Sequence, residues 1–283
     1  MIKKLLENHI VNNTPDESVA LLLSGGIDSI TVGLAADNVG RKVHAYSFFL
    51  DGEVSYDFVK AAEVAHKMQW EFTPIVIPKN NLVDDFKKLW KMGCRKKTHF
   101  ECVFPFLYIY PKIKEQYVIS GWGADGYFCV SKKCQMRYSS KEKFEKHLKW
   151  CKDNNAKPTT FDDYRNHYFS KGECAGIDEH NKLVKKYKKT HITPYLDNDV
   201  SKHLMSMNYD QLNKGGQKGY VRKAFTKLKI FGNIKPHTNL HLGSGVDKLF
   251  ETLLNNDDIN FKGRKRMMDI CRDWYEKNAV LPI

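Results

Sequence analysis

The run Ser24-Gly25-Gly26-Ile27-Asp28-Ser29 has the residue types and spacing to hold a phosphate group. It follows an apolar stretch, Val19 to Leu23, that predicts a short buried strand, and a helical pattern begins near Ser29. The paired glycines allow a positive φ and a close approach of the backbone to a ligand. Backbone amides at the start of a helix attract anions. A carboxylate at Asp28 would repel phosphate, so its presence indicates a Mg²⁺ ion between the two.

A second glycine turn, Ser120-Gly121-Trp122-Gly123-Ala124-Asp125, also follows a short apolar stretch. Two further segments come later in the chain, Thr193-Pro194-Tyr195-Leu196-Asp197 and Lys218-Gly219-Tyr220-Val221-Arg222-Lys223-Ala224. In this order, the four motifs resemble those of the N-type ATP pyrophosphatases (the PP-loop family), in the branch of asparagine synthetase and β-lactam synthetase. A weaker match covers residues 235–245. The resemblance extends over most of residues 15–255.

This resemblance implies an enzyme that splits ATP between its α and β phosphates and adenylylates a substrate oxygen. It also implies roles for individual residues. Asp28 and Asp125 would hold Mg²⁺, and Lys218 would be the catalytic cation on the reacting phosphates, with Arg222 as a weaker candidate. The residues implied to bind ATP are Ser24, Gly25, Gly26, Asp28, Ser29, Ser120, Gly121, Gly123 and Lys218.

The surrounding pattern predicts the elements that position these motifs. Apolar stretches at 19–23, 43–49, 72–77 and 117–120 predict strands. Residues 1–18 predict a leading helix and a turn, and further helices are predicted over 57–68, 82–90 and 103–113. Strands that alternate with helices indicate parallel βαβ units, whose ligands bind at the carboxyl ends of the strands. We therefore expect an α/β fold with a parallel sheet. The resemblance implies a sheet of the five-stranded type with helices on both faces, like that of the adenine nucleotide alpha hydrolases. The C-terminal part, including 246–254 and 264–276, is predicted to be helical, with Cys271 a buried thiol.

Several positions depart from the family pattern. The asparagine-forming members carry a glutamate between the glycines of the second turn, and the β-lactam-forming members a tyrosine, whereas this chain has Trp122. Gly126 replaces an acidic residue after the aspartate, and Ile2 stands where glutaminase-bearing relatives have a nucleophilic cysteine. We therefore expect the synthetase part without a glutaminase domain, and not a plain glutamine-dependent asparagine synthetase.

The segment after the second turn has the ligand spacing of a zinc site. Cys129, Cys134, His147 and Cys151 follow the pattern Cys-x4-Cys-x12-His-x3-Cys, and Tyr138 and Phe144 occupy the two core positions of a ββα finger. A unit of this size has too small a core to fold without such a metal. Two roles remain open, a lid over the active site and a DNA-binding finger with Ser140, Lys143 and Lys146 toward the bases.

Charge and composition limit the remaining choices. The 283-residue chain has a net charge of +13, which favours a polyanionic partner such as a nucleic acid, although a basic surface also aids solubility. Residues 132–152 carry eight Lys or Arg against two Glu. No apolar run has the length of a membrane span, and an odd number of cysteines, seven, argues against a disulfide framework. We expect a cytoplasmic protein with an ATP pyrophosphatase core (1–126), an inserted finger (127–152) and a helical part (153–283).

Three functions are consistent with the sequence. The first is an AMP-forming amide ligase of the asparagine synthetase type, a carbon–nitrogen ligase that joins a carboxylate or amide-oxygen acceptor to ammonia or another amine. The second applies the same adenylylation to a nucleic acid base or to a carboxylate on a base. The third is a zinc-dependent nucleic-acid-binding protein with a vestigial nucleotide site. The expected cofactors are ATP, Mg²⁺ and Zn²⁺.

Overall fold

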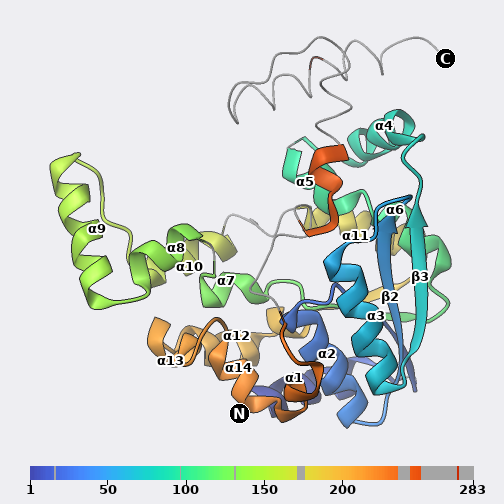
Figure 1. Ribbon diagram of the computed structural model, residues 1–283, viewed down its shortest axis with the longest axis horizontal. Coiled ribbons are helices and arrows are strands. Elements are labelled where there is room, and N and C mark those ends of the chain that lie inside the picture. Colours follow the sequence, from blue (N-terminus) through green and yellow to red (C-terminus); the bar gives the residue numbers. More distant parts are fainter. Residues whose placement is uncertain are drawn as a thin grey trace.

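A five-stranded parallel sheet forms the centre of the fold in the computed structural model (Figure 1). The structure describes residues 1–15, 17–95, 97–130, 132–170, 176–234, 243–249 and 273. The strand order is β3-β2-β1-β4-β5, and every neighbouring pair is parallel. The strands are β1 (Ser18–Leu22), β2 (Lys42–Leu50), β3 (Glu71–Ile77), β4 (Tyr117–Ile119) and β5 (Thr190–Ile192). The predicted fold class is confirmed.

Each face of the sheet has its own apolar core, because side chains alternate along a strand. From β1, Val19 and Leu21 point into one core, and Ala20 and Leu22 into the other. The first core is covered by α1 (Ile2–Asn13), α2 (Ile27–Asn38), α3 (Tyr56–Met68), α12 (Asn198–Met205) and α14 (Gly219–Ala224). The second is covered by α4 (Leu82–Met92), α5 (Lys97–Val103), α6 (Phe106–Ile109) and α11 (Ile177–Lys186).

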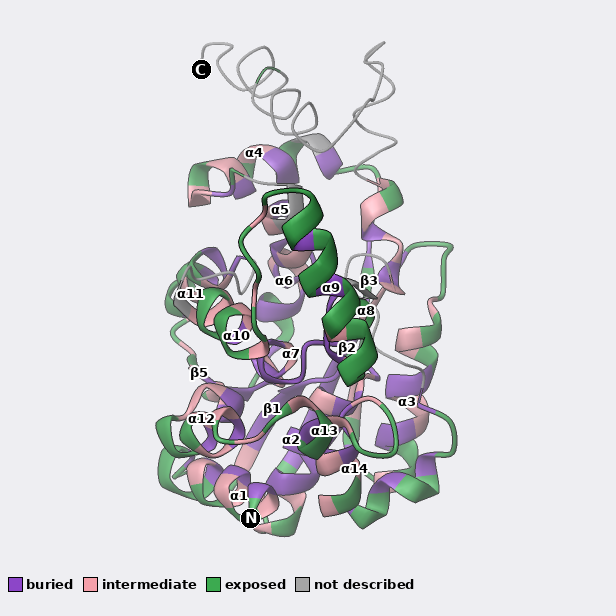
Figure 2. Cartoon of the chain, turned by 90° about the vertical axis from the view of Figure 1, so that its left-hand side faces the viewer, coloured by how far each residue is buried: buried purple, intermediate pink, exposed green. Residues whose placement is uncertain are grey.

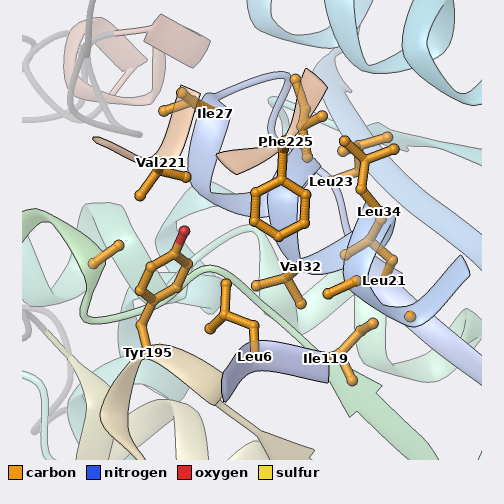
Figure 3. Close-up of a cluster of buried hydrophobic side chains, with 14 of the residues drawn as sticks. Leu6, Leu21, Leu23, Ile27, Val32, Leu34, Ile119, Tyr195, Val221 and Phe225 are labelled. Atoms are coloured by element: carbon orange, nitrogen blue, oxygen red, sulfur yellow. The ribbon is translucent and has the colours of Figure 1, made fainter. Parts of the chain in front are cut away.

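The first core connects segments that are far apart in the chain. In Figure 3, Tyr195, Val221 and Phe225 lie with Ile27 and Val32 of α2. Tyr195 belongs to the 3₁₀ helix η2 (Pro194–Leu196), and Phe225 precedes a second one, η3 (Thr226–Phe231). The start of α14 is thereby held close to the loop that begins α2. The short helix α13 (Tyr209–Asn213) lies just before α14 in the chain.

Two predictions about secondary structure need correction. The helix predicted over 103–113 is interrupted at Pro105, where α5 ends and α6 begins, and the chain continues into the 3₁₀ helix η1 (Tyr110–Lys112). A proline removes one backbone donor and crowds the preceding turn, so a break here is expected. Residues 190–192 form an edge strand that the sequence had not predicted. The predicted helices at 246–254 and 264–276, the motif at 235–245 and Cys271 lie wholly or mostly outside the described residues.

The predicted ββα zinc finger is wrong. After α7 (Ala124–Phe128) the chain forms three helices, α8 (Lys132–Tyr138), α9 (Lys141–Asp153) and α10 (Phe161–Ser170), where two strands and one helix were expected. We call residues 132–170 the helical arm, which extends away from the sheet (Figure 1). Its small core includes Tyr138, Phe161 and Tyr209, of which the last two lie outside the expected finger.

The expected zinc ligands do not form a metal site. Cys129 and Cys134 are free thiols joined by a side-chain hydrogen bond, and this hydrogen bond together with burial raises the pKa of the Cys129 thiol. Cys151 Sγ lies 3.6 Å from His147 Nδ1 on α9. Over the residues that the structure describes, there is no group of three or more His, Cys, Asp or Glu side chains that could hold a metal ion. Packing between α8 and α9 forms the core of this segment, where a core around a metal ion had been expected.

None of the helices in the described residues is both long and apolar enough to cross a lipid bilayer.

Candidate active site

The loop between β1 and α2 is held in shape by its two serines. Ser24 N donates to Ser29 Oγ at 3.2 Å, and Gly26 N donates to Ser24 Oγ at 3.3 Å. Ser29 Oγ in turn donates to Gly26 O at 3.0 Å. Gly26 is the N-cap of α2, and it has no side chain to occupy the amides of the first helical turn. The loop is therefore preorganised, with the positive end of α2 at its centre.

The two glycine turns lie side by side, because β1 and β4 are neighbours in the sheet. A Cβ atom at Gly121 would lie 2.6 Å from the backbone of Asp28 and Ser29, so the turns touch through their backbones. Gly25 has φ +71°, and a Cβ there would lie 2.4 Å from Asp57 O at the start of α3. Gly123, with φ +87°, is the N-cap of α7 and packs against Leu196. Only glycine fits at these contacts.

Lys218 connects both turns. Its ammonium donates to Asp28 Oδ2 and, at 2.5 Å, to Asp125 Oδ1. The lysine is 1% exposed, whereas the Asp28 and Asp125 side chains are 16% and 33% exposed. Burial alone would lower the pKa of Lys218, but the attraction of Asp125 and Asp28 outweighs burial and raises it. A charged lysine therefore lies between two carboxylates from different motifs.

The position of Lys218 is determined by its own backbone and by its neighbours. It is the N-cap of α14 and has φ +57°, a left-handed conformation that is unusual for a side chain of this size. Its amide donates to Asn213 Oδ1 at 2.9 Å, and Asn213 Nδ2 donates to Phe128 O at 3.1 Å. A Cβ at Gly219 would lie 2.0 Å from Lys214 O, so the turn into α14 requires a glycine. These contacts direct the ammonium toward the two turns.

Arg222, the weaker catalytic candidate, makes its side-chain hydrogen bonds to the backbone. Arg222 donates through Nε to Gln217 O at 3.1 Å and through Nη2 to Ile234 O at 3.5 Å. Burial lowers its pKa, and the charge of Asp28 opposes that shift. No ion pair of Arg222 occurs among the described residues. Its observed partners are backbone carbonyls, which is consistent with a supporting position.

The segment that ends in Asp197 braces the site from the other side. Tyr195 Oη and Thr31 Oγ1 lie 2.8 Å apart, and Thr31 Oγ1 donates to the carbonyl of Asp28 at 2.9 Å. Asp197 caps α12 through the amides of Asp199 and Val200. These contacts give the motif a structural part in holding the first loop.

Trp122 lies against a group of buried rings that the sequence did not indicate. Its ring centroid is 4.6 Å from that of His180 and 6.1 Å from that of Phe106. His191, on β5, approaches Ser120 Oγ to 2.8 Å through Nε2. Burial lowers the pKa of His191 to about 4, and burial together with His191 lowers that of His180. Both imidazoles are therefore neutral at pH 7, and only the tertiary fold brings them beside the second turn.

The paired carboxylates fit the predicted Mg²⁺ ion. Asp28 and Asp125 already converge on one cation, the ammonium of Lys218, so both can reach a common point. Carboxylate oxygens with phosphate oxygens and water are the ligands that Mg²⁺ prefers. Two carboxylates alone cannot supply all the oxygen ligands of a Mg²⁺ ion. The phosphates of a bound nucleotide and water would supply the remaining ligands.

Comparison with known proteins gives one family. The family model described as asparagine synthase matches residues 2–186. No curated protein matches the chain. Among solved structures, the chain is similar to NMN synthetase from Francisella tularensis (19% identity, TM-score 0.37, over 68% of this chain and 97% of that one). It is also similar to the U34-tRNA thiolase NcsA from Methanococcus maripaludis with its 4Fe-4S cluster (11% identity, TM-score 0.34, over 99% and 80%).

Proposed function

The chain belongs to the asparagine synthase family, and from that premise we propose that it is an ATP-dependent ligase that forms AMP and pyrophosphate. One observation supports this reaction most strongly: Lys218, Asp28 and Asp125 come from three separate motifs and meet next to the Ser24–Ser29 loop. Each of these motifs is one that ATP pyrophosphatases use. The motifs have the order found in that family, and their side chains also meet in space. Both features together are improbable unless the residues share one function.

The loop would bind the phosphates of ATP, and Lys218 would stabilise the charge that develops during the reaction. The amides at the start of α2 would bind phosphate oxygens, and the serine hydrogen bonds would keep those amides in place. Asp28 and Asp125 would hold a Mg²⁺ ion, and this ion would neutralise part of the negative charge on the phosphates. Lys218 would donate to the oxygens on which negative charge develops as the bond between the α and β phosphates breaks.

The reaction would proceed in two steps. An acceptor oxygen attacks the α-phosphorus, a new P–O bond forms, and pyrophosphate leaves with the bonding electron pair. Ammonia or another amine then attacks the activated carbon, AMP leaves with the former acceptor oxygen, and the nitrogen loses a proton. Trp122 has no group that accepts a proton, so the second step must differ from that of relatives with a glutamate at this position.

Two measurements test this proposal. The full-length protein should bind ATP in the presence of Mg²⁺, measured by calorimetry, and should form AMP and pyrophosphate when it is supplied with a suitable acceptor. Lys218→Met should abolish turnover, whereas Lys227→Met, which removes a half-exposed surface lysine, should retain it. Release of ADP and inorganic phosphate would contradict the proposed bond cleavage, and failure to bind ATP would contradict the site.

A further inference from the structure

We propose that helix α9 of the helical arm is a binding surface for single-stranded nucleic acid. This inference concerns a different surface from the ATP site, and it stands or falls without the proposed reaction.

The exposure of α9 is the first observation. Of its 13 residues, only Phe144, His147 and Cys151 are turned toward the protein, and the other ten are exposed. The three inward residues form one narrow stripe at helical spacing. Figure 2 shows α9 exposed along almost its whole length, and Figure 1 shows it at the far end of the arm. A partner can therefore approach most of its circumference.

The charge of this segment is the second observation. Residues 132–152 have a net charge of +6 out of +13 for the whole chain. Within α9, Lys146 is paired with Glu142 at 2.6 Å, and Lys141 lies 4.0 Å from Glu145. No ion pair joins Lys143, Lys149 or Lys152 to an acidic side chain in the part of the chain that the structure describes. Such a surplus of positive charge favours a polyanion.

Exposed apolar side chains among the lysines are the third observation. Trp150 is 54% exposed on α9, and Lys143, seven residues before it, lies on the same face of the helix. Leu148 is 38% exposed on another face of the helix. The indole of Trp150 is therefore open to contact with a partner. Next to lysines that contact phosphates, the indole offers a flat surface on which a base can stack, and unpaired bases are available only in single strands.

The root of the arm connects this surface to the ATP site. Tyr127, on α7 with Asp125, packs against Phe169 of α10 with ring centroids 4.4 Å apart and the rings tilted by 34°. The guanidinium of Arg165 donates to the carbonyls of Leu204, Met205 and Met207, which fixes α10 to the end of α12. A nucleic acid strand bound to α9 would thus be held by the helical arm. The base of this arm packs against α7, the helix that carries Asp125.

Fluorescence anisotropy with three labelled probes tests the proposal: a single-stranded RNA of 20 nucleotides, a single-stranded DNA of the same length and a blunt DNA duplex. Measurements at 50, 100 and 200 mM KCl give the salt dependence. The single strands should bind more tightly than the duplex, and their affinity should fall as salt rises. The RNA and DNA probes show which sugar is preferred.

Two variants separate charge from stacking. Lys143→Glu/Lys149→Glu should weaken binding at least tenfold at 100 mM KCl and flatten the salt slope by about 1.4, since each lost phosphate contact contributes about 0.7. Glutamate at position 143 is compatible with folding, because it lies three residues after the N-cap Ser140. Trp150→Ala should weaken single-strand binding roughly 5- to 150-fold and leave the salt slope unchanged.

The matched control is Lys185→Glu/Lys186→Glu, which makes the same change in charge at two exposed positions in the last turn of α11. It should bind single strands like the parent protein. Equal loss in this control would mean that only the overall charge matters and would overturn the proposal. Undiminished binding by the Trp150→Ala variant, tighter binding to the duplex, or binding to anionic phosphatidylserine vesicles in place of nucleic acid would also overturn it. Circular dichroism of each variant verifies that the overall helix content is retained.

Discussion

Removal of the positive charge at Lys218 should leave two carboxylates facing each other without a cation between them. Lys218→Met is the suitable change, because methionine keeps an unbranched apolar stem and is an L residue with the same strain at φ +57°. Breaking a buried ion pair by removing one partner costs about 3–5 kcal/mol. Asp28 and Asp125 are 16% and 33% exposed, so water screens part of their repulsion, and we expect a loss of about 2–3 kcal/mol.

The assay is urea denaturation of the ligand-free protein in low salt, with and without Mg²⁺. Adding Asp125→Asn to Lys218→Met should restore at least 1 kcal/mol, since it removes one of the two repelling charges. Mg²⁺ should stabilise the Lys218→Met variant more than the parent, because the ion replaces the missing cation. Lys227→Met serves as the control, since its pair with Asp37 at 3.0 Å is partly solvated and contributes less than about 1 kcal/mol.

Two results would refute this reasoning. If Lys218→Met unfolds at the same urea concentration as the parent, the ammonium does not hold the carboxylates together. If Asp125→Asn destabilises the Lys218→Met variant further, repulsion between the carboxylates is not the source of the loss.

Three further predictions follow from the described contacts. Because burial lowers the pKa of His191 to about 4, against about 6.5 when unfolded, the folded state binds fewer protons, so stability should fall by about 2 kcal/mol from pH 7 to pH 5. His191→Gln should show a smaller fall in urea titrations, and an unchanged fall would contradict this assignment. Gly121→Ala should destabilise the protein by about 1–3 kcal/mol and weaken ATP binding at least tenfold in calorimetry, whereas Gly40→Ala, whose Cβ would meet no atom within 4 Å, should bind ATP normally. Arg165→Met should cost about 3 kcal/mol and raise hydrogen exchange selectively in residues 132–170, so a uniform increase would argue against its role at the root of the arm.

The core of the sheet was predictable because its signals are local. The stretches at 19–23, 43–49 and 72–77 are apolar, long enough for strands and bounded by turns, and each of them forms a strand close to its expected limits. The edge strand at 190–192 has three residues and follows a run of lysines. Its assignment depends on pairing with β4, a contact with residues about seventy positions away, and no local pattern records such a contact.

The zinc finger prediction failed for a related reason. The spacing of cysteines and histidine gives distances along the chain, and it does not specify whether the residues between them form strands or a helix. In the fold, Phe161 and Tyr209 supply part of the core that the metal was expected to replace. The family resemblance implied that Asp28, Asp125 and Lys218 all act at the phosphates of ATP, and their contact with one another is seen only in the fold. The rings around Trp122 come from α6, α11 and β5 and have no common sequence signal.

The chain leaves the body after α7 and returns to it at the start of α10, at nearly the same place. Cys129, directly after α7, and Phe161, at the start of α10, belong to one small cluster, so the intervening residues form a loop with adjacent ends. The entropy cost of closing such a loop rises only slowly with its length. Evolution can therefore lengthen, shorten or exchange this segment without disturbing Asp125 or the sheet. We therefore expect related chains to differ most in length in this segment.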